Sequence, residues 1–205
     1  MARTPKTSPP NSTAASIGSL PRPQRKAAIA TLTRQEGLTL LDDWPFWARP
    51  DQRGPDGDWR FWLFLGGRGA GKTRAGAEFV RAAVAAGARR IALVGATLSD
   101  VREVMMAGPS GLCGLGPAQA RPRAEPSRRR LVWPCGALAY AFSAEDPDSL
   151  RGPQFDLAWG DEVAAWAHPE ETLAMLDFAL RLGERPRAAL TTTPRPIPLV
   201  RRLLN

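Results

Sequence analysis

The residues best suited to chemistry lie in the stretch GGRGAGKT, residues 66–73, where glycines surround a lysine and a threonine. This stretch matches the pattern G-x-x-x-x-G-K-[ST], whose glycines let backbone N–H groups approach phosphate oxygens without an intervening Cβ. A helix that begins near Gly71 would direct its positive N-terminal end at the same anion. We therefore predict a nucleotide site with Lys72 at the β- and γ-phosphates and the Thr73 hydroxyl on Mg²⁺. The predicted phosphate-binding residues are Gly66, Gly67, Arg68, Gly69, Ala70, Gly71, Lys72 and Thr73.

The setting of this stretch favours a nucleotide site over a glycine-rich turn that contains Lys-Thr by chance. The apolar run at residues 61–65 predicts a buried strand, and the spacing of residues 71–86 predicts a helix. A phosphate loop is expected between a strand and a helix of this kind. The face of the helix that we expect to be apolar contains Ala75, Phe79, Ala82 and Ala86.

Two adjacent carboxylates, Asp161 and Glu162, follow another apolar run about 90 residues further along the chain. Residues 155–160 (FDLAWG) predict a buried strand, although a tryptophan and a glycine make it less aliphatic than is usual. An Asp at the end of this strand would lie beside the Mg²⁺ held by Thr73, and the adjacent Glu would polarise a water aimed at the γ-phosphate. Asp-Glu pairs are also common on surfaces, and the phosphate loop favours the catalytic interpretation here.

A third polar group, Thr191, Thr192 and Thr193, ends an apolar stretch about 30 residues after the acidic pair. A strand that ends in three hydroxyl residues would be able to sense the phosphate or the Mg²⁺ and relay its state. The alternative is a threonine-rich strand end that is stopped by a proline.

Strand and helix patterns alternate along most of the chain, which predicts an α/β fold with a parallel sheet. The predicted strands are at residues 61–65, 90–96, two within 129–144, 155–160 and 187–193. The predicted helices are at residues 25–41 (interrupted by Gly37), 71–86, 97–106, 169–182 and at the basic C-terminus, and residues 107–130 are expected to form an arginine-rich loop.

Composition restricts the class of protein. A chain of 205 residues suits one domain, and its net charge of +8 makes a polyanionic partner plausible. Two cysteines without CxxC spacing argue against a zinc site, and no apolar run is long enough to span a membrane. The proline-, serine- and threonine-rich start lacks the apolar core of a signal peptide, so we expect residues 1–24 to be disordered and the protein to be cytoplasmic.

The combination of GGRGAGKT, SLRGPQFDLAWGDE and LTTTPRP, in this order and spacing, resembles the N-terminal ATPase domain of the large terminase subunit. That enzyme is the DNA-packaging motor of tailed bacteriophages and gene transfer agents, and the segment upstream of the phosphate loop is similar to the gene transfer agent version. The resemblance covers roughly residues 35–205. It implies an additional-strand (ASCE) P-loop NTPase core in residues 25–205, with ATP and Mg²⁺ as cofactors, in the cytoplasm of a bacterial host.

The resemblance also assigns roles to individual residues. It implies that Lys72 and Thr73 are the phosphate-loop lysine and Mg²⁺ ligand, that Asp161 is the Walker B aspartate, and that Glu162 is the catalytic glutamate. The threonine run 191–193 matches the coupling motif that links hydrolysis to DNA movement.

Three further residues are assigned by the resemblance alone. Arg68 matches an arginine near the γ-phosphate, and the alternative is solvent exposure beside the loop. Arg151 resembles a finger supplied to the neighbouring subunit, and the alternative is a salt bridge to Asp146 or Asp148. Gln52 falls at the position of an adenine-reading glutamine, and the alternative is an exposed loop amide.

The implied partners are double-stranded DNA, a portal protein and capsid, a small terminase subunit and further copies of the chain in a ring. This sequence departs from the family pattern because it ends soon after the coupling motif, so we expect an incomplete sheet and no nuclease domain. Two other functions remain open: a small-molecule P-loop kinase, which would need an acceptor pocket, and a truncated remnant that binds nucleotide without turnover.

Overall fold

The computed structural model describes residues 13–204 and divides the chain into two compact units, Met1–Arg53 and Gly54–Asn205. This boundary lies about 30 residues after the one predicted from the sequence, because residues 25–53 form short helices of their own. No helix among the described residues is long and apolar enough to cross a membrane.

The N-terminal unit is built from short helices that begin at side-chain caps. Thr13 and Thr33 each form a capping box with the residue three positions later, which satisfies free backbone N–H groups of the first turn. We predicted disorder for residues 1–24; residues 1–12 lie outside the described residues, whereas residues 14–19 and 22–24 are helical. The first three helices bury no side chain. The helices are α1 (Ala14–Ser19), α2 (Arg22–Ala30), α3 (Arg34–Asp42), α4 (Trp44–Trp47) and the 3₁₀ helix η1 (Pro50–Gln52).

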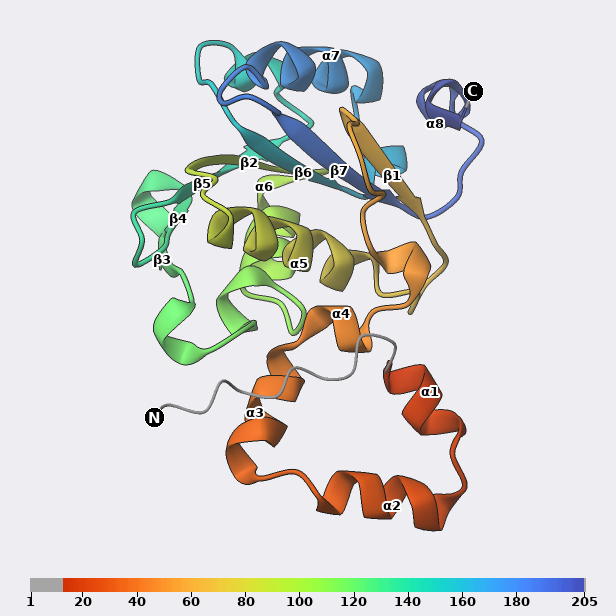
Figure 1. The fold of residues 1–205 in the computed structure, drawn as a ribbon. Helices are drawn as coiled ribbons and strands as arrows, with labels where there is room; N and C mark the ends of the chain where they lie inside the picture. Colours follow the sequence, from red (N-terminus) through yellow and green to blue (C-terminus); the bar gives the residue numbers. More distant parts are fainter. Residues whose placement is uncertain (1–12, 205) are drawn as a thin grey trace. The chain divides into compact units, whose positions relative to one another are not determined.

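The second unit contains a seven-stranded sheet in the order β1-β7-β6-β2-β5-β4-β3 (Figure 1). The first five strands of this order are parallel, and β4 and β3 continue the sheet as antiparallel strands. The strands are β1 (Phe61–Leu65), β2 (Arg90–Gly95), β3 (Arg123–Glu125), β4 (Arg130–Val132), β5 (Leu138–Ser143), β6 (Leu157–Asp161) and β7 (Arg187–Thr192).

Strand β7 lies between β1 and β6, although it comes last in the chain. Because these three strands are parallel, their carboxyl ends lie at one edge of the sheet. The phosphate loop follows β1, the acidic pair ends β6, and the threonine run ends β7. The insertion of β7 therefore brings the three sequence motifs to the same edge.

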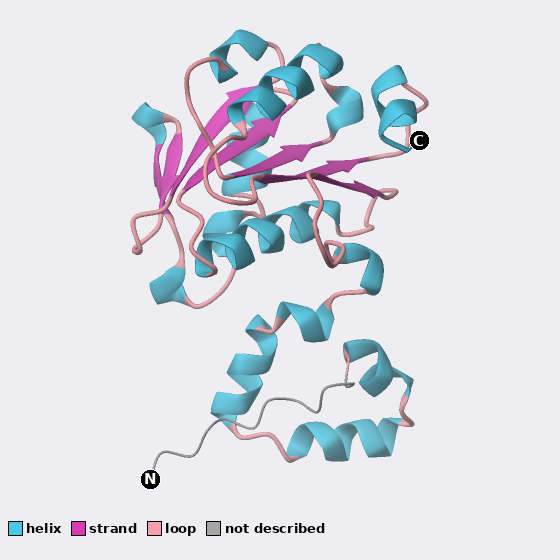
Figure 2. Cartoon of the chain, turned by 45° about the horizontal axis from the view of Figure 1, so that its top comes forward, coloured by secondary structure: helices cyan, strands magenta, loops and turns pink. Residues whose placement is uncertain are grey.

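Helices cover both faces of the sheet, as Figures 1 and 2 show. Helix α5 (Lys72–Ala85) packs against β6 and β7 on one face. Helix α7 (Pro169–Ala179) packs on the other face, where Leu173 and Leu176 join Ala158 and Leu190 in the main apolar core. The remaining helices are α6 (Leu98–Asp100), α8 (Pro198–Leu204), the π-helix η2 (Val101–Met106), and the 3₁₀ helices η3 (Leu112–Gly114), η4 (Ala118–Ala120), η5 (Pro126–Arg128), η6 (Pro147–Leu150) and η7 (Val163–Ala165).

Two sequence predictions about local structure were wrong. In α5, Ala75 is buried as predicted, but Ala82 and Ala86 are exposed, and the helix also buries a stripe that contains Gly76, Val80 and Val84. These three residues recur every four positions, so they follow one helix face as closely as the predicted set. Residues 107–130, predicted as a loop, contain β3 and three 3₁₀ helices.

Candidate functional site

The phosphate loop connects β1 to α5 through residues 66–71. Its start is tied to β7, because Gly66 N donates to the Thr192 carbonyl oxygen at 3.1 Å. Gly69 (φ 76°) and Gly71 (φ 78°) adopt the left-handed conformation that glycine tolerates best. α5 begins directly after the second of these glycines, so free N–H groups of its first turn lie at the loop. The predicted order of strand, glycine-rich loop and helix is confirmed.

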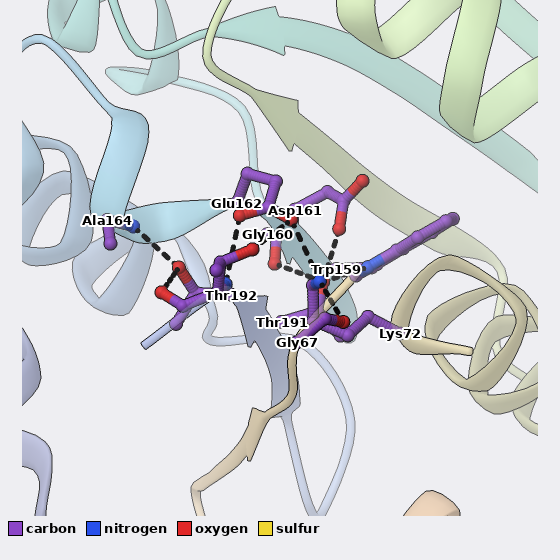
Figure 3. Close-up of polar contacts among 10 residues, drawn as sticks. Gly67, Lys72, Trp159, Gly160, Asp161, Glu162, Ala164, Thr191 and Thr192 are labelled. Atoms are coloured by element: carbon purple, nitrogen blue, oxygen red, sulfur yellow. Dashed lines mark hydrogen bonds and ion pairs between the residues drawn. The ribbon is translucent and has the colours of Figure 1, made fainter. Parts of the chain in front are cut away.

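Lys72 is 8% exposed, and its ammonium group lies within the loop (Figure 3). The Nζ atom donates to the Gly67 carbonyl oxygen at 3.2 Å and lies 3.1 Å from Glu162 Oε1. A buried lysine needs such partners because burial without them disfavours its charged form. The lysine of the phosphate loop and the glutamate at the end of β6 are therefore in direct contact.

Asp161 is the last residue of β6 and is 7% exposed. Its Oδ1 accepts a hydrogen bond from Thr191 Oγ1 at 2.5 Å. The pKa of the Asp161 carboxyl is raised to about 6, mainly by burial. The hydrogen bond from Thr191 and the charge of Lys72 lower this pKa, and the charge of nearby Glu162 raises it. A buried carboxylate in this position would gain from a neighbouring cation.

Glu162 follows β6 in the left-handed conformation, with φ 49° and ψ 50°. This conformation turns the chain out of the strand, and the carboxylate accepts from the Thr193 backbone N at 2.9 Å and from Thr193 Oγ1 at 3.1 Å. With the Lys72 contact, a single carboxylate joins the phosphate loop to the end of β7. Glu162 therefore begins a turn and does not continue the strand.

Two of the three threonines contact the acidic pair, and the third contacts the segment that follows it. Thr191 bonds Asp161, Thr193 bonds Glu162, and the buried Thr192 Oγ1 accepts from the Ala164 backbone N at 3.0 Å. The end of β7 is thus tied to each residue of the acidic pair and to the short helix η7 that follows it.

Thr73 is half-buried in the first turn of α5 and lines a groove of about 250 Å³. The other residues of this groove are Glu103, Val104, Gly108, Pro109 and Ser110. A hydroxyl oxygen from Thr73 and the buried carboxylate of Asp161 are oxygen ligands of the kind that Mg²⁺ prefers. This donor set fits the ion, with the remaining positions left for phosphate oxygens and water.

The structure gives the following surroundings for the remaining three predicted residues. Arg68 is exposed in the phosphate loop. Arg151 is exposed and pairs with Asp148 at 2.8 Å, one of the two salt bridges named as its alternative. Gln52 belongs to the N-terminal unit, where it is buried rather than exposed and its Oε1 accepts from Arg49 N at 3.0 Å.

Sequence reasoning missed one buried residue of the site, Trp159. It lies two residues before Asp161 on the same face of β6, and its Nε1 donates to Thr191 Oγ1 at 3.1 Å. The period-two alternation of strands placed it on that face, but its contact with β7 had no signal in the sequence.

A phosphate loop after β1, an acidic pair after β6 and a polar strand end between them define a P-loop NTPase of the additional-strand class. Residues 63–203 match the family model described as terminase large subunit, T4likevirus-type, N-terminal. The chain therefore belongs to the large terminase family, in the region of its N-terminal ATPase domain. No curated protein matches the chain.

Solved structures share the fold at low sequence identity. The large terminase of a thermophilic bacteriophage is 18% identical, with a TM-score of 0.54 over 77% of this chain and 38% of its own. The same terminase in complex with ADP is 18% identical, with a TM-score of 0.50 over 76% of this chain and 37% of its own. The ATPase domain of the Thermus phage P74-26 large terminase is 16% identical, with a TM-score of 0.48 over 82% of this chain and 71% of its own. The chain spans less than two fifths of the length of that thermophilic phage terminase.

Proposed function

We propose that this chain binds ATP with Mg²⁺, hydrolyses it, and uses the hydrolysis to move double-stranded DNA into a capsid. The observation that carries the proposal is the position of the Glu162 carboxylate, which contacts Lys72 of the phosphate loop and Thr193 at the end of β7. Family membership adds support, because the match covers the ATPase region of a packaging enzyme.

The binding step uses the phosphate loop. Backbone N–H groups of residues 66–73 and the start of α5 would hold the β- and γ-phosphates, with the Lys72 ammonium as their counter-charge. The related large terminase that was solved with ADP supports a nucleotide as the ligand.

Thr73 and Asp161 would hold Mg²⁺. When bound, the ion neutralises charge that develops on the phosphate oxygens. The chain's own contribution is to keep Asp161 in place through the Thr191 hydrogen bond, so that its carboxylate needs no reorganisation.

Hydrolysis requires a base beside the γ-phosphate. Lys72 Nζ lies 3.1 Å from Glu162 Oε1, so a phosphate held by Lys72 would lie close to this carboxylate. Glu162 would orient a water and accept its proton as the water oxygen attacks phosphorus and the bond to ADP breaks. Arg68, exposed in the loop, and Arg151, exposed on the surface and available to a neighbouring copy in a ring, would stabilise charge on the transferred group.

The link to movement passes through β7. Thr193 holds the same carboxylate that would take the proton, and Thr192 is bonded to Ala164 after β6. A change in the charge of Glu162 would therefore alter its hydrogen bonds with Thr193, directly after β7.

The proposed partners are double-stranded DNA, portal, capsid, small terminase subunit and further copies of the chain, in the cytoplasm of a bacterial host. We expect residues 1–205 to have no nuclease activity.

Two variants separate binding from hydrolysis. Lys72→Ala is expected to lose ATP binding in calorimetry, because the buried counter-charge of the phosphates is removed. Glu162→Gln is expected to bind ATP but to release phosphate at least about a hundredfold more slowly, since the base is lost. Normal ATPase in Glu162→Gln would contradict the proposal, and phosphoryl transfer to a metabolite would favour a kinase.

The role of Arg151 is tested by mixing variants at high protein concentration. Arg151→Ala and Glu162→Gln should each be inactive alone. A mixture should recover activity, because one interface then joins an intact arginine to an intact glutamate. No recovery, or full activity of Arg151→Ala alone, would exclude a finger that acts between copies.

A further inference from the structure

Trp159 is buried in the layer between the sheet and α5. None of its surface is exposed, and it lies two residues before Asp161 on β6. Its one polar group, the indole Nε1–H, donates to Thr191 Oγ1 at 3.1 Å (Figure 3). A buried indole N–H needs an acceptor, so this hydrogen bond ties the ring to β7.

The Thr191 hydroxyl has one proton and several neighbours. Trp159 Nε1 lies at 3.1 Å, the Gly160 carbonyl oxygen at 3.3 Å and Asp161 Oδ1 at 2.5 Å. The indole is a donor only, so Thr191 must accept from it and keeps its own proton for an oxygen. The shorter distance directs that proton to Asp161. The indole thereby orients the hydroxyl as a donor to an ionised carboxylate.

Gly76 of α5 provides the space that the indole occupies. A Cβ at this position would lie 2.7 Å from Trp159 Cζ2, and closer still to Cε2 and Nε1. Gly76 follows Lys72 by four residues and therefore lies one turn further along the same helix face. The indole thus contacts both the helix that bears Lys72 and Thr73 and the hydroxyl that holds Asp161.

We propose that Trp159 is a positioning residue for the Mg²⁺-nucleotide site. Through Thr191 it keeps the Asp161 carboxylate oriented to bind the ion, and through its contact with Gly76 it determines how closely α5 packs against β6. This inference rests on the proposed function. It assigns to the indole N–H a role that packing alone would not require, because a phenylalanine would fill most of the same space.

The test compares the affinity for ADP with Mg²⁺ and with a chelator, measured by calorimetry on the full chain. Trp159→Phe removes the N–H and keeps an aromatic ring. We expect it to lower the Mg²⁺-dependent gain in affinity by about tenfold, as is typical when the partner of a metal ligand is lost, and to leave chelator affinity unchanged. Trp133→Phe is the matched control, because Trp133 is also buried (5% exposed) and lies outside the site.

Three further variants test the same contact from β7 and from α5. Thr191→Val should reproduce the loss, and Thr191→Ser, which retains the hydroxyl, should recover most of the Mg²⁺-dependent gain. Gly76→Ala should lower it from the helix side by displacing the indole. If Trp159→Phe does not fold, Gly76→Ala decides the matter in the same assay, because it displaces the indole and leaves the Thr191 and Asp161 side chains unchanged.

The outcomes separate this inference from the function on which it rests. A wild-type chain that does not bind ADP refutes the proposed function. Wild-type binding with an undiminished Mg²⁺-dependent gain in Trp159→Phe refutes the positioning role. An equal loss in Trp159→Phe and Trp133→Phe also refutes it, because the effect then belongs to packing in general.

Discussion

Replacing Asp161 by asparagine is expected to stabilise the protein at neutral pH while removing its activity. The carboxyl is 7% exposed, and burial raises its pKa from 3.8 to about 6. A tenfold change in an equilibrium corresponds to about 1.4 kcal/mol, so this difference amounts to about 3 kcal/mol of unfavourable free energy when the folded chain carries the ionised group. Asparagine keeps an oxygen that accepts from Thr191 and carries no charge.

The sign of the pH dependence follows from the raised pKa. Below about pH 4 the carboxyl is protonated in both states and contributes nothing. Between about pH 4 and pH 6 the folded state binds more protons than the unfolded state, so stability falls as pH rises. Above pH 6 both states are ionised and the full penalty remains. The advantage of Asp161→Asn should therefore grow from near zero at pH 4 to its full value at pH 7.5.

Guanidinium unfolding followed by circular dichroism at several pH values measures this difference. Because the new amide N–H₂ also needs partners, about 3 kcal/mol is an upper limit for the gain at pH 7.5. Asp58→Asn, at an exposed position of the same unit, is the control for loss of one charge. An Asp161→Asn variant that is no more stable than wild type at pH 7.5, or whose advantage does not vary with pH, would refute the reasoning.

Substitutions at three other positions give further testable predictions. Gly160→Ala should lower the free energy of unfolding by about 2 kcal/mol, because the new Cβ would lie 2.8 Å from a ring carbon of Trp166, whereas Gly37→Ala meets open space and should show no such loss in the same denaturation assay. Glu78→Gln should cost about 2 kcal/mol, since Glu78 is 4% exposed and pairs with two arginines of its own helix; unchanged stability would mean that water compensates these arginines. Arg68→Ala should reduce hydrolysis more than ATP binding, and an equal loss of both would remove its assignment to the γ-phosphate.

The part of the site that could be predicted from sequence is the part carried by local patterns. Lys72 and Thr73 follow from a short motif whose glycines have one physical purpose. Asp161 and Glu162 follow because polar residues at the ends of parallel strands meet at one edge of the sheet. Thr193 contacts Glu162, so the threonine run lies beside the acidic pair, as expected for polar residues at the end of a neighbouring parallel strand.

The rest depends on contacts between distant segments. Gly76 and Trp159 are 83 positions apart, and neither periodicity nor composition indicates that one makes room for the other. The apolar face of α5 was misjudged for the same reason, because small residues fit several faces and the sheet selects one. In the N-terminal unit, the helical prediction for residues 25–41 agrees with α3, which begins at the Thr33–Glu36 capping box, whereas α1 had a weaker signal because its box pairs Thr13 with a serine instead of Glu or Gln.

The left-handed backbone of Glu162 has a consequence for anyone who engineers this chain. A residue with a Cβ is held in that conformation at a cost of about 1 kcal/mol, which glycine largely avoids. Glycine or asparagine at position 162 would relieve that backbone cost, but each would also leave the buried Lys72 ammonium and the Thr193 groups without the carboxylate that contacts them. The contacts of the Glu162 side chain therefore offset the cost of its backbone, and a library sorted for thermal resistance alone should keep glutamate at this position.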